Sequence, residues 1–415
     1  MHEKADQNCE AGGSSEDEAS GTAATNTAAP VGACPVCEGT QTARLLDICD
    51  APVFCNVLWP TEQQALEAAT GDIALSYCRG CGHVFNSAFE TSKTTYSAAY
   101  ENSLHFSQHF SSYASGLARY LVDTYDVRHK DVIDVGCGRG DFLSVLCSVG
   151  DNRGYGFDKS YAPSEHGECT ASQMTFVSDF YGPRYASYPC DLLSCRHVLE
   201  HIEQPNAFLD EIRSATEDKR DVVMFFEVPN AAYTLRDLGI WDLIYEHCSY
   251  YSANSLQHLF ARHGFPIARI SELYDGQFLG IECAPNGGAA VACVPTNDAV
   301  EDCQTFPARY KEKLAHWRTV MGDLAEQGLR AVVWGAGSKG VTFLNLLRPS
   351  AVDCVVDLNP RKHGRFVPGT GQEVVAPERL LSIKPDVVIV MNAVYANEIS
   401  SALAAMGLSP QLLLA

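Results

Sequence analysis

Residues 132–140 read Val-Ile-Asp-Val-Gly-Cys-Gly-Arg-Gly, a short β-branched run that breaks into glycines at alternate positions. The run predicts a buried strand. Glycines after it let the backbone turn sharply, so that a ligand can lie against the main-chain N–H groups at the start of the next helix. The spacing is G-x-G-x-G, not the G-x-G-x-x-G of dinucleotide-binding loops, and Asp134 stands inside the strand. We therefore predict a ligand site at this strand-to-helix turn.

Two further acidic residues follow at the ends of expected strands. Asp158 closes the run Gly-Tyr-Gly-Phe-Asp about 20 residues after the loop, where a carboxylate can take both hydroxyls of a ribose. Asp179 follows the next strand. In this order the signals resemble motif I and its successors in the class I S-adenosylmethionine (SAM)-dependent methyltransferases. The resemblance implies that the strand acid holds the amino group of the cofactor and that Asp179 lies near its adenine. The implied cofactor site comprises Asp134, Gly136, Gly138, Gly140, Asp158, Asp179 and His197.

The bulk properties indicate a multi-domain globular protein. The chain has 415 residues, of which 46% are hydrophobic, so two or three domains are expected. A formal net charge of −21 disfavours nucleic acid and acidic membrane surfaces as partners and favours a small-molecule substrate. The chain has no apolar run of about 18 residues and no signal-peptide pattern, which predicts a cytoplasmic protein.

The N-terminal part of the chain carries two Cys-x-x-Cys pairs. Residues 1–30 are small and acidic and predict a disordered tail. Residues 31–95 contain both pairs, which together can supply a tetrahedral S4 site. Because four thiolates leave no position for water, we predict a structural Zn²⁺, the alternative being unligated surface thiols. The predicted ligands are Cys34, Cys37, Cys78 and Cys81.

Residues 96–298 alternate strand and helix patterns and predict a mostly parallel, doubly covered sheet. Ligands in such sheets bind beyond the carboxyl ends of the strands, which puts His197 and His201 at the rim of the site. An insertion at 237–255 contains Tyr245, Glu246 and His247 and is expected to fold over the same edge. The predicted strands span 131–135, 153–157, 174–178, 191–195, 221–228 and 266–272.

The last part of the chain indicates a second α/β unit. Residues 299–327 predict a linker helix, and 328–415 begin with a strand that leads into G-x-G-x-x-G. Asp357 stands 17 residues after Gly340, the last glycine of this loop. The loop alone favours NAD binding, but about 90 residues are expected to make only one mononucleotide-type half.

The three parts in this order resemble the sugar C-methyltransferase family, which acts on nucleotide-linked 4-keto-deoxysugars in antibiotic pathways. The resemblance implies a class I methyltransferase sheet between a small zinc-binding module and a C-terminal Rossmann-like domain. It implies that His247 removes the proton next to a ketone, that Glu246 orients its ring and that His201 is a second active-site histidine. Tyr245 and Tyr100 would line the pocket, and the C-terminal glycine loop with Lys339 and Arg365 would hold the nucleotide.

Three other functions remain open at this point. The acceptor atom can be oxygen or nitrogen on another small metabolite, since Tyr245 adjoins Glu246 directly, whereas the sugar enzymes usually have an acidic residue between them. The C-terminal loop can serve an NAD-dependent oxidoreductase. A zinc-linked binding module without catalysis would show no affinity for the cofactor.

Overall fold

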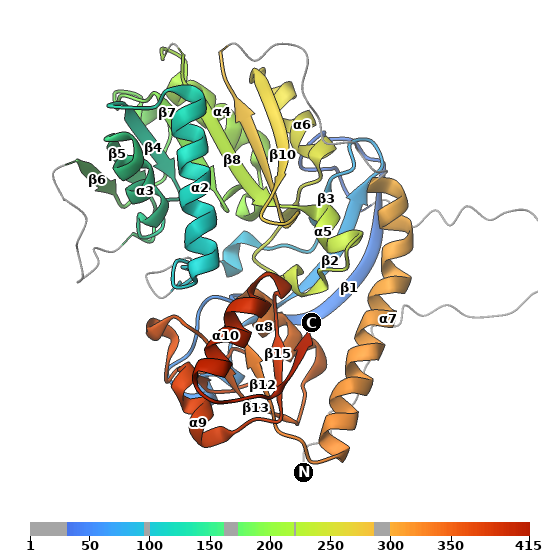
Figure 1. Ribbon diagram of the computed structural model, residues 1–415. Coiled ribbons are helices and arrows are strands. Elements are labelled where there is room, and N and C mark those ends of the chain that lie inside the picture. Colours follow the sequence, from blue (N-terminus) through green and yellow to red (C-terminus); the bar gives the residue numbers. More distant parts are fainter. Residues whose placement is uncertain (1–30, 95–99, 162–172, 220, 286–298) are drawn as a thin grey trace, which may run out of the picture.

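The computed structural model describes residues 31–94, 100–161, 173–219, 221–285 and 299–415, which form three sheets (Figure 1). The predicted acidic tail, residues 1–30, lies outside the described residues. The seven-stranded sheet forms one end of the molecule and the five-stranded sheet the other, with the long strands of the four-stranded sheet beside and between them. None of the helices in the described ranges combines the length and apolar character needed to cross a bilayer.

The seven-stranded sheet has the order β10-β11-β8-β7-β4-β5-β6. Its strands are β4 (Asp131–Val135), β5 (Arg153–Phe157), β6 (Met174–Val177), β7 (Leu192–Arg196), β8 (Val223–Pro229), β10 (Ile267–Leu273) and β11 (Phe278–Cys283). The helices of this part are α2 (Gln108–Tyr125), α3 (Asp141–Gly150), α4 (Pro205–Thr216), α5 (Ala231–Leu235) and α6 (Ala253–Arg262). The six predicted strands are confirmed to within a few residues. Strand β11, which runs antiparallel to both β8 and β10, was not predicted from the sequence.

The five-stranded sheet is parallel throughout, with the order β14-β13-β12-β15-β16. Its strands are β12 (Ala331–Trp334), β13 (Val352–Val356), β14 (Val374–Val375), β15 (Val387–Val390) and β16 (Gln411–Leu414). Its helices are α8 (Ser338–Leu347), α9 (Leu380–Ile383) and α10 (Ala396–Ala405). The expectation of a single mononucleotide-type half is therefore wrong. Short strands and connections let the chain add two strands on the far side of β12, as in the second half of a dinucleotide-binding sheet.

The four-stranded sheet joins distant parts of the chain. It has the order β1-β2-β3-β9, and its strands are β1 (Thr42–Pro52), β2 (Thr70–Cys78), β3 (Val84–Asn86) and β9 (Ser249–Tyr250). The short helix α1 (Glu62–Leu66) lies between β1 and β2. Since β9 comes from the insertion at 237–255, the N-terminal sheet is completed by the segment that carries Glu246 and His247.

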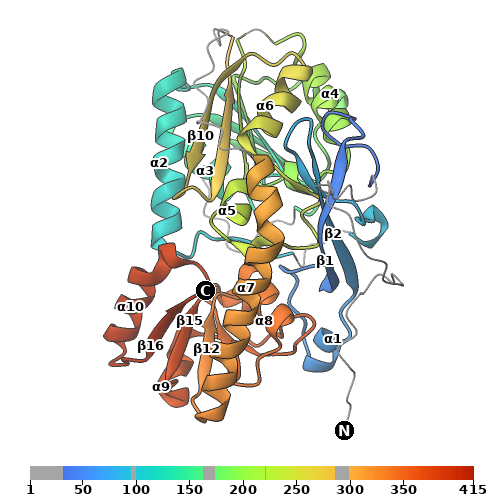
Figure 2. The ribbon, with the colours of Figure 1, turned by 90° about the vertical axis from the view of Figure 1, so that its right-hand side faces the viewer.

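The linker helix α7 (Ala299–Glu326) runs beside β1 and reaches the five-stranded sheet (Figure 2). Its bounds agree with the predicted linker helix at 299–327 to within one residue. Trp317 of α7, Trp241 of the insertion and Phe343 of α8 pack together, with Phe343 4.9 Å from Trp241 and 5.2 Å from Trp317 between ring centroids. Burying three such rings contributes several kcal/mol. This aromatic cluster fixes the insertion against the C-terminal sheet and so positions the residues that follow it.

Candidate functional site

The glycine loop after β4 makes the sharp turn that its sequence predicts. Gly136, Gly138 and Gly140 all have positive φ, at +70°, +55° and +85°. A Cβ on Gly136 would lie 2.1 Å from Cγ2 of Val198, whereas one on Gly138 would meet nothing within 4 Å. The loop thus requires glycine for its turn and leaves open space above Gly138.

The two acidic residues beside this loop are held by short hydrogen bonds. Oδ2 of Asp158 accepts from the Gly138 N–H at 2.9 Å, and Oδ1 accepts from the Ser160 N–H at 2.7 Å. Asp134 is 4% exposed and accepts from the Ser194 hydroxyl. Burial raises the pKa of Asp134 to about 6, against the effect of this hydrogen bond. The loop therefore has one carboxylate, Asp158, hydrogen-bonded to its backbone and a second, Asp134, buried beneath it.

Asp179, predicted near the adenine, lies on a partly exposed turn. Its carboxylate accepts from the Tyr185 hydroxyl at 2.7 Å and from the Phe180 N–H at 2.9 Å. The hydrogen bond from Tyr185 lowers the pKa of this carboxyl group. Asp179 is thus ionised and oriented within its own turn.

His197 follows β7 directly in a left-handed conformation, with φ of +55°. Its Nε2 lies 2.9 Å from Oε1 of Glu227, and its Nδ1 lies 3.6 Å from Oε1 of Glu200. Glu227 also pairs with Arg196 at 2.7 Å and accepts from the Tyr113 hydroxyl. Burial lowers the pKa of His197, but the contacts with Glu200 and Glu227 outweigh it and raise the pKa to about 9. His197 is therefore a cation held between two carboxylates.

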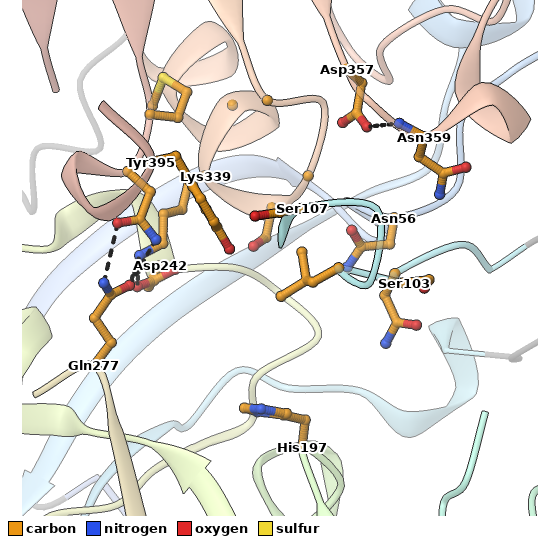
Figure 3. A pocket seen from close by; sticks show the side chains of 18 of the residues that line it. Asn56, Ser103, Ser107, His197, Asp242, Gln277, Lys339, Asp357, Asn359 and Tyr395 are labelled. Carbon is orange, nitrogen blue, oxygen red and sulfur yellow. Dashed lines mark hydrogen bonds and ion pairs between the residues drawn. The ribbon is translucent and has the colours of Figure 1, made fainter. Parts of the chain in front are cut away.

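A cavity of about 280 Å³ separates the carboxyl edge of the seven-stranded sheet from the C-terminal glycine loop (Figure 3). Three histidines, His197, His201 and His247, contribute to one side of its lining, and Gly335 and Lys339 to the other. Figure 3 shows His197 on the side opposite Lys339, Asp357 and Asn359. Of the predicted cofactor residues, His197 lines this cavity, whereas the following do not: Asp134, Gly136, Gly138, Gly140, Asp158 and Asp179. His197 thus lies where the loop site and the cavity meet.

His201 and His247 lie side by side in the cavity wall. Their ring centroids are 4.9 Å apart at an interplanar angle of 72°. Nδ1 of His201 donates to the backbone carbonyl of Glu246 at 3.0 Å. Burial lowers the pKa of both rings, that of His247 to about 3. Both imidazoles are therefore neutral at physiological pH and able to accept a proton.

Two predicted catalytic side chains point elsewhere. Oε2 of Glu246 accepts from the Cys55 N–H at 2.8 Å, so its carboxylate faces the N-terminal module and does not orient His247. Burial raises the pKa of Glu246 to about 7. Tyr245 is fully buried outside the cavity, and its hydroxyl accepts from the Glu90 N–H at 2.9 Å. Residues 245 and 246 lie in a turn, where the directions of successive side chains depend on backbone dihedrals, which adjacency in sequence does not reveal.

Tyr100 and Lys339 line the cavity as predicted, but each is already engaged. The Tyr100 hydroxyl accepts from Nδ2 of Asn56 at 3.2 Å. Nζ of Lys339 lies 3.0 Å from Oδ2 of Asp242 and donates to Oε1 of Gln277 at 2.9 Å (Figure 3). The charge of Lys339 is therefore compensated within the protein.

Arg365 is exposed and does not line the cavity, so its predicted role in substrate binding is not supported. Lys362, three residues earlier, is buried in the wall and donates to the Ala336 carbonyl at 3.1 Å. In a tight turn such as 360–364, the side chain that faces inward depends on backbone dihedrals and not on local charge density. The basic residues at 361–365 therefore indicated the right segment, but the side chain in the cavity wall is that of Lys362 and not that of Arg365.

The C-terminal loop repeats the arrangement seen at Asp158. Oδ2 of Asp357 accepts from the Ala336 N–H at 2.8 Å, and Oδ1 accepts from the Asn359 N–H at 2.8 Å. Asn359 in turn donates to Glu101 at 3.0 Å, which ties the loop to the segment at 100–107. Asn56 and Glu101 were missed from the sequence, because nothing in their local pattern indicates a site so far along the chain.

The four predicted metal ligands come together. The Sγ atoms of Cys34 and Cys81 are 3.6 Å apart, and those of Cys37 and Cys78 are 3.5 Å apart. All four lie within 4.8 Å of one another. A tetrahedral site with Zn–S bonds of about 2.3 Å has sulfurs about 3.8 Å apart. The cluster can therefore hold a metal ion of this kind without rearrangement.

Comparison with known proteins identifies the activity. Residues 105–269 match the model of a methyltransferase domain, and residues 296–409 match that of a C-methyltransferase C-terminal domain. The protein is a SAM-dependent methyltransferase. The residues beside the first glycine loop fit this cofactor, because an oriented carboxylate, Asp158, stands where ribose hydroxyls need an acceptor and the space above Gly138 is open.

Solved structures show weak likenesses to the methyltransferase. A magnesium protoporphyrin IX methyltransferase from Synechocystis PCC 6803 is 18% identical over 42% of this chain and 83% of its own, with a TM-score of 0.33. The plantazolicin methyltransferase BpumL is 14% identical over 44% of this chain and 85% of its own, with a TM-score of 0.34. A comparison with curated proteins found no match.

Proposed function

We propose that the protein methylates a carbon atom next to a ketone, on a nucleotide-linked keto-deoxysugar or a related natural-product intermediate. The observation that carries the proposal is the cavity between the two α/β units, with two neutral histidines on one side and a nucleotide-type glycine loop on the other. The match of residues 296–409 to a C-methyltransferase C-terminal domain supports carbon as the acceptor.

A carbon next to a ketone is a weak acid, so the transfer needs a positioned base. His247 is that base in our proposal, since its ring lies in the cavity wall and burial keeps it neutral. SAM, when bound at the first glycine loop, supplies an electrophilic methyl group. His201, oriented by the Glu246 carbonyl, lies beside His247 as the second histidine of the site. His197 lines the same cavity, one residue before Val198, whose side chain lies against Gly136 of the first glycine loop.

The C-terminal loop is proposed to hold the nucleotide end of the acceptor. Backbone N–H groups at the start of α8 favour phosphate, and the Asp357 carboxylate is oriented toward the same cavity wall for ribose hydroxyls. Because Lys339 is paired with Asp242, we assign phosphate binding to the helix terminus and not to this side chain.

We also propose that residues 31–95 form a module that is held together by a structural zinc ion at the four cysteines. The S···S distances support this assignment. Cys78 is fully buried against the core of the seven-stranded sheet, so loss of the metal should destabilise both the N-terminal module and this sheet. Cys78→Ser is expected to lower the bound zinc by one equivalent per chain, as measured by elemental analysis. Unchanged zinc content would refute the ligand set.

Calorimetric titration tests the central proposal. The purified protein is titrated with SAM, and a second sample with thymidine diphosphate in the presence of S-adenosylhomocysteine. Binding of both ligands is expected. If Asp158→Ala weakens only the first and Asp357→Ala only the second, the two sites are separate. Binding of the cofactor without the nucleotide would overturn the nucleotide-linked acceptor and leave other small keto compounds as substrates to test.

A further inference from the structure

Glu200, His201 and His247 form a second group of metal-binding side chains, separate from the four cysteines. Each offers one ligand atom, and these atoms lie within 4.8 Å of one another. In the part of the chain that the structure describes, this group and the cysteine cluster are the two sets of at least three such ligands. All three side chains line the cavity.

Two atoms of this group are buried without a hydrogen-bond partner among the described residues. They are Oε2 of Glu200 and Nδ1 of His247. Glu200 is 1% exposed and lines the cavity, so a group that satisfies its carboxylate has to lie inside that cavity. Buried polar atoms in native proteins are nearly always paired. The two atoms therefore indicate that a further group lies between them and binds both the carboxylate of Glu200 and the imidazole of His247.

The surrounding contacts are those of ligands held for a metal ion. Nδ1 of His201 donates to the Glu246 carbonyl at 3.0 Å, which leaves the lone pair on Nε2. The second oxygen of Glu200 lies 3.6 Å from Nδ1 of His197, which restrains the carboxylate from behind. Metal-binding histidines and carboxylates are typically oriented by outer contacts of these two kinds.

We propose that Glu200, His201 and His247 bind a divalent transition-metal ion such as Zn²⁺, with a further coordination position open to the cavity. Two histidines and one glutamate are a ligand set of zinc sites that keep an open position, unlike the closed shell of four cysteines. A buried water molecule is the other group that would satisfy the same two atoms.

Metal binding here has a direct consequence for His247. A neutral imidazole has one nitrogen lone pair, so a metal ion on Nδ1 leaves Nε2 protonated and unable to accept a proton. Zn²⁺ at this site therefore blocks the base. This consequence rests on the function proposed above, whereas the metal site itself does not.

Metal stoichiometry tests the site independently of turnover. The full chain is equilibrated with Zn²⁺, desalted and analysed for metal, and two equivalents per chain are expected. Glu200→Gln and His201→Ala should each bind one, whereas His258→Ala, which removes an exposed histidine of α6, should keep two. One equivalent in the wild type, with no change in His201→Ala, would overturn the proposal in favour of a buried water.

Cobalt substitution distinguishes the two sites by their absorption spectra. Co²⁺ at four thiolates gives intense charge-transfer bands, and Co²⁺ bound by two histidines and a carboxylate gives weaker visible bands only. Both sets are expected in the wild type, and Cys78→Ser should keep the weak set alone. If the weak bands are absent from the cobalt-loaded wild type, the proposal is overturned. If two metal ions bind, and no keto acceptor is methylated after the ion at Glu200, His201 and His247 has been removed, the site stands and the proposed function fails.

Discussion

The two glycine loops of this protein have the same hydrogen-bond pattern in different surroundings. Asp158 and Asp357 each accept one N–H from the loop and one from the residue two positions later. Two residues before the first glycine, however, the first unit has the buried Asp134 and the second has the buried Val333. The first loop can therefore neutralise an amino group from below, and the second cannot. In our proposal, the oriented carboxylate of each loop binds a ribose, and the residue beneath the loop distinguishes the two ligands.

The largest expected effect is a loss of turnover that leaves ligand binding at both loops unchanged. His247→Ala should lower kcat by about 10² to 10⁴, the range for loss of a general base. Affinities for SAM and for thymidine diphosphate should stay within a few-fold of the wild type, because the residues proposed to bind these ligands are unchanged. Single-turnover kinetics and calorimetry measure the two quantities. His258→Ala is the matched control, and wild-type turnover of His247→Ala would exclude this base.

Separate substitutions of Asp158 and Asp357 test whether the two loops bind different ligands. Asp158→Ala should weaken SAM binding by about 10- to 100-fold, because hydroxyls lose a charged acceptor worth about 1.5–3 kcal/mol. Asp357→Ala should do the same for thymidine diphosphate and leave SAM binding unchanged. Calorimetry on both variants with both ligands measures the four affinities. If either variant weakens both ligands equally, the two loops do not bind separate molecules.

The acid beneath the first loop predicts a pH dependence that the second unit lacks. Burial raises the pKa of Asp134 to about 6 from its ordinary 3.8, so folding favours the protonated form. Its contribution to stability is full below pH 3.8 and is lost as the pH rises through 6, a fall of about 1 kcal/mol between pH 5 and 7 without cofactor. Over the same range SAM affinity should rise, because the ionised carboxylate pairs with the cofactor's amino group.

Asp134→Asn is the control for this prediction. Denaturant unfolding of the wild type and of the variant at pH 5 and 7 measures the difference in free energy. The variant should lack the pH-dependent difference and bind SAM more weakly at pH 7. A wild-type profile in the variant would assign the pH dependence to another group.

The smallest effect concerns Lys339 in the second loop. Because its ammonium group is already paired with Asp242 and Gln277, Lys339→Gln should change thymidine diphosphate affinity less than threefold. The free energy of unfolding should fall by about 1 to 3 kcal/mol, since Asp242 loses its partner. A tenfold loss of nucleotide affinity with unchanged stability would instead show that this lysine contacts phosphate.

Some parts of the site could be predicted because they depend on neighbours in the chain. The strand at 131–135, its glycine turn and Asp158 form one strand-loop-helix-strand unit, whose geometry follows from glycine dihedrals and strand spacing. The four-cysteine cluster could be predicted from the two Cys-x-x-Cys pairs for the same reason, since each pair forms a local turn. Asp357 was found by the same reasoning as Asp158.

The sequence by itself determined six strands of the seven-stranded sheet, the two loops and the four cysteines, because each depends on backbone preferences and periodicity over a few residues. Only the tertiary structure decided the directions of Tyr245, Glu246 and Arg365, the pairing of β9 with β3, and the meeting of Glu200 with His247. These outcomes depend on which surfaces pack together between distant parts of the chain, as where Glu246 meets the N–H of Cys55, 191 residues away. A side chain's partner is chosen by the free energy of that packing, which local sequence does not contain.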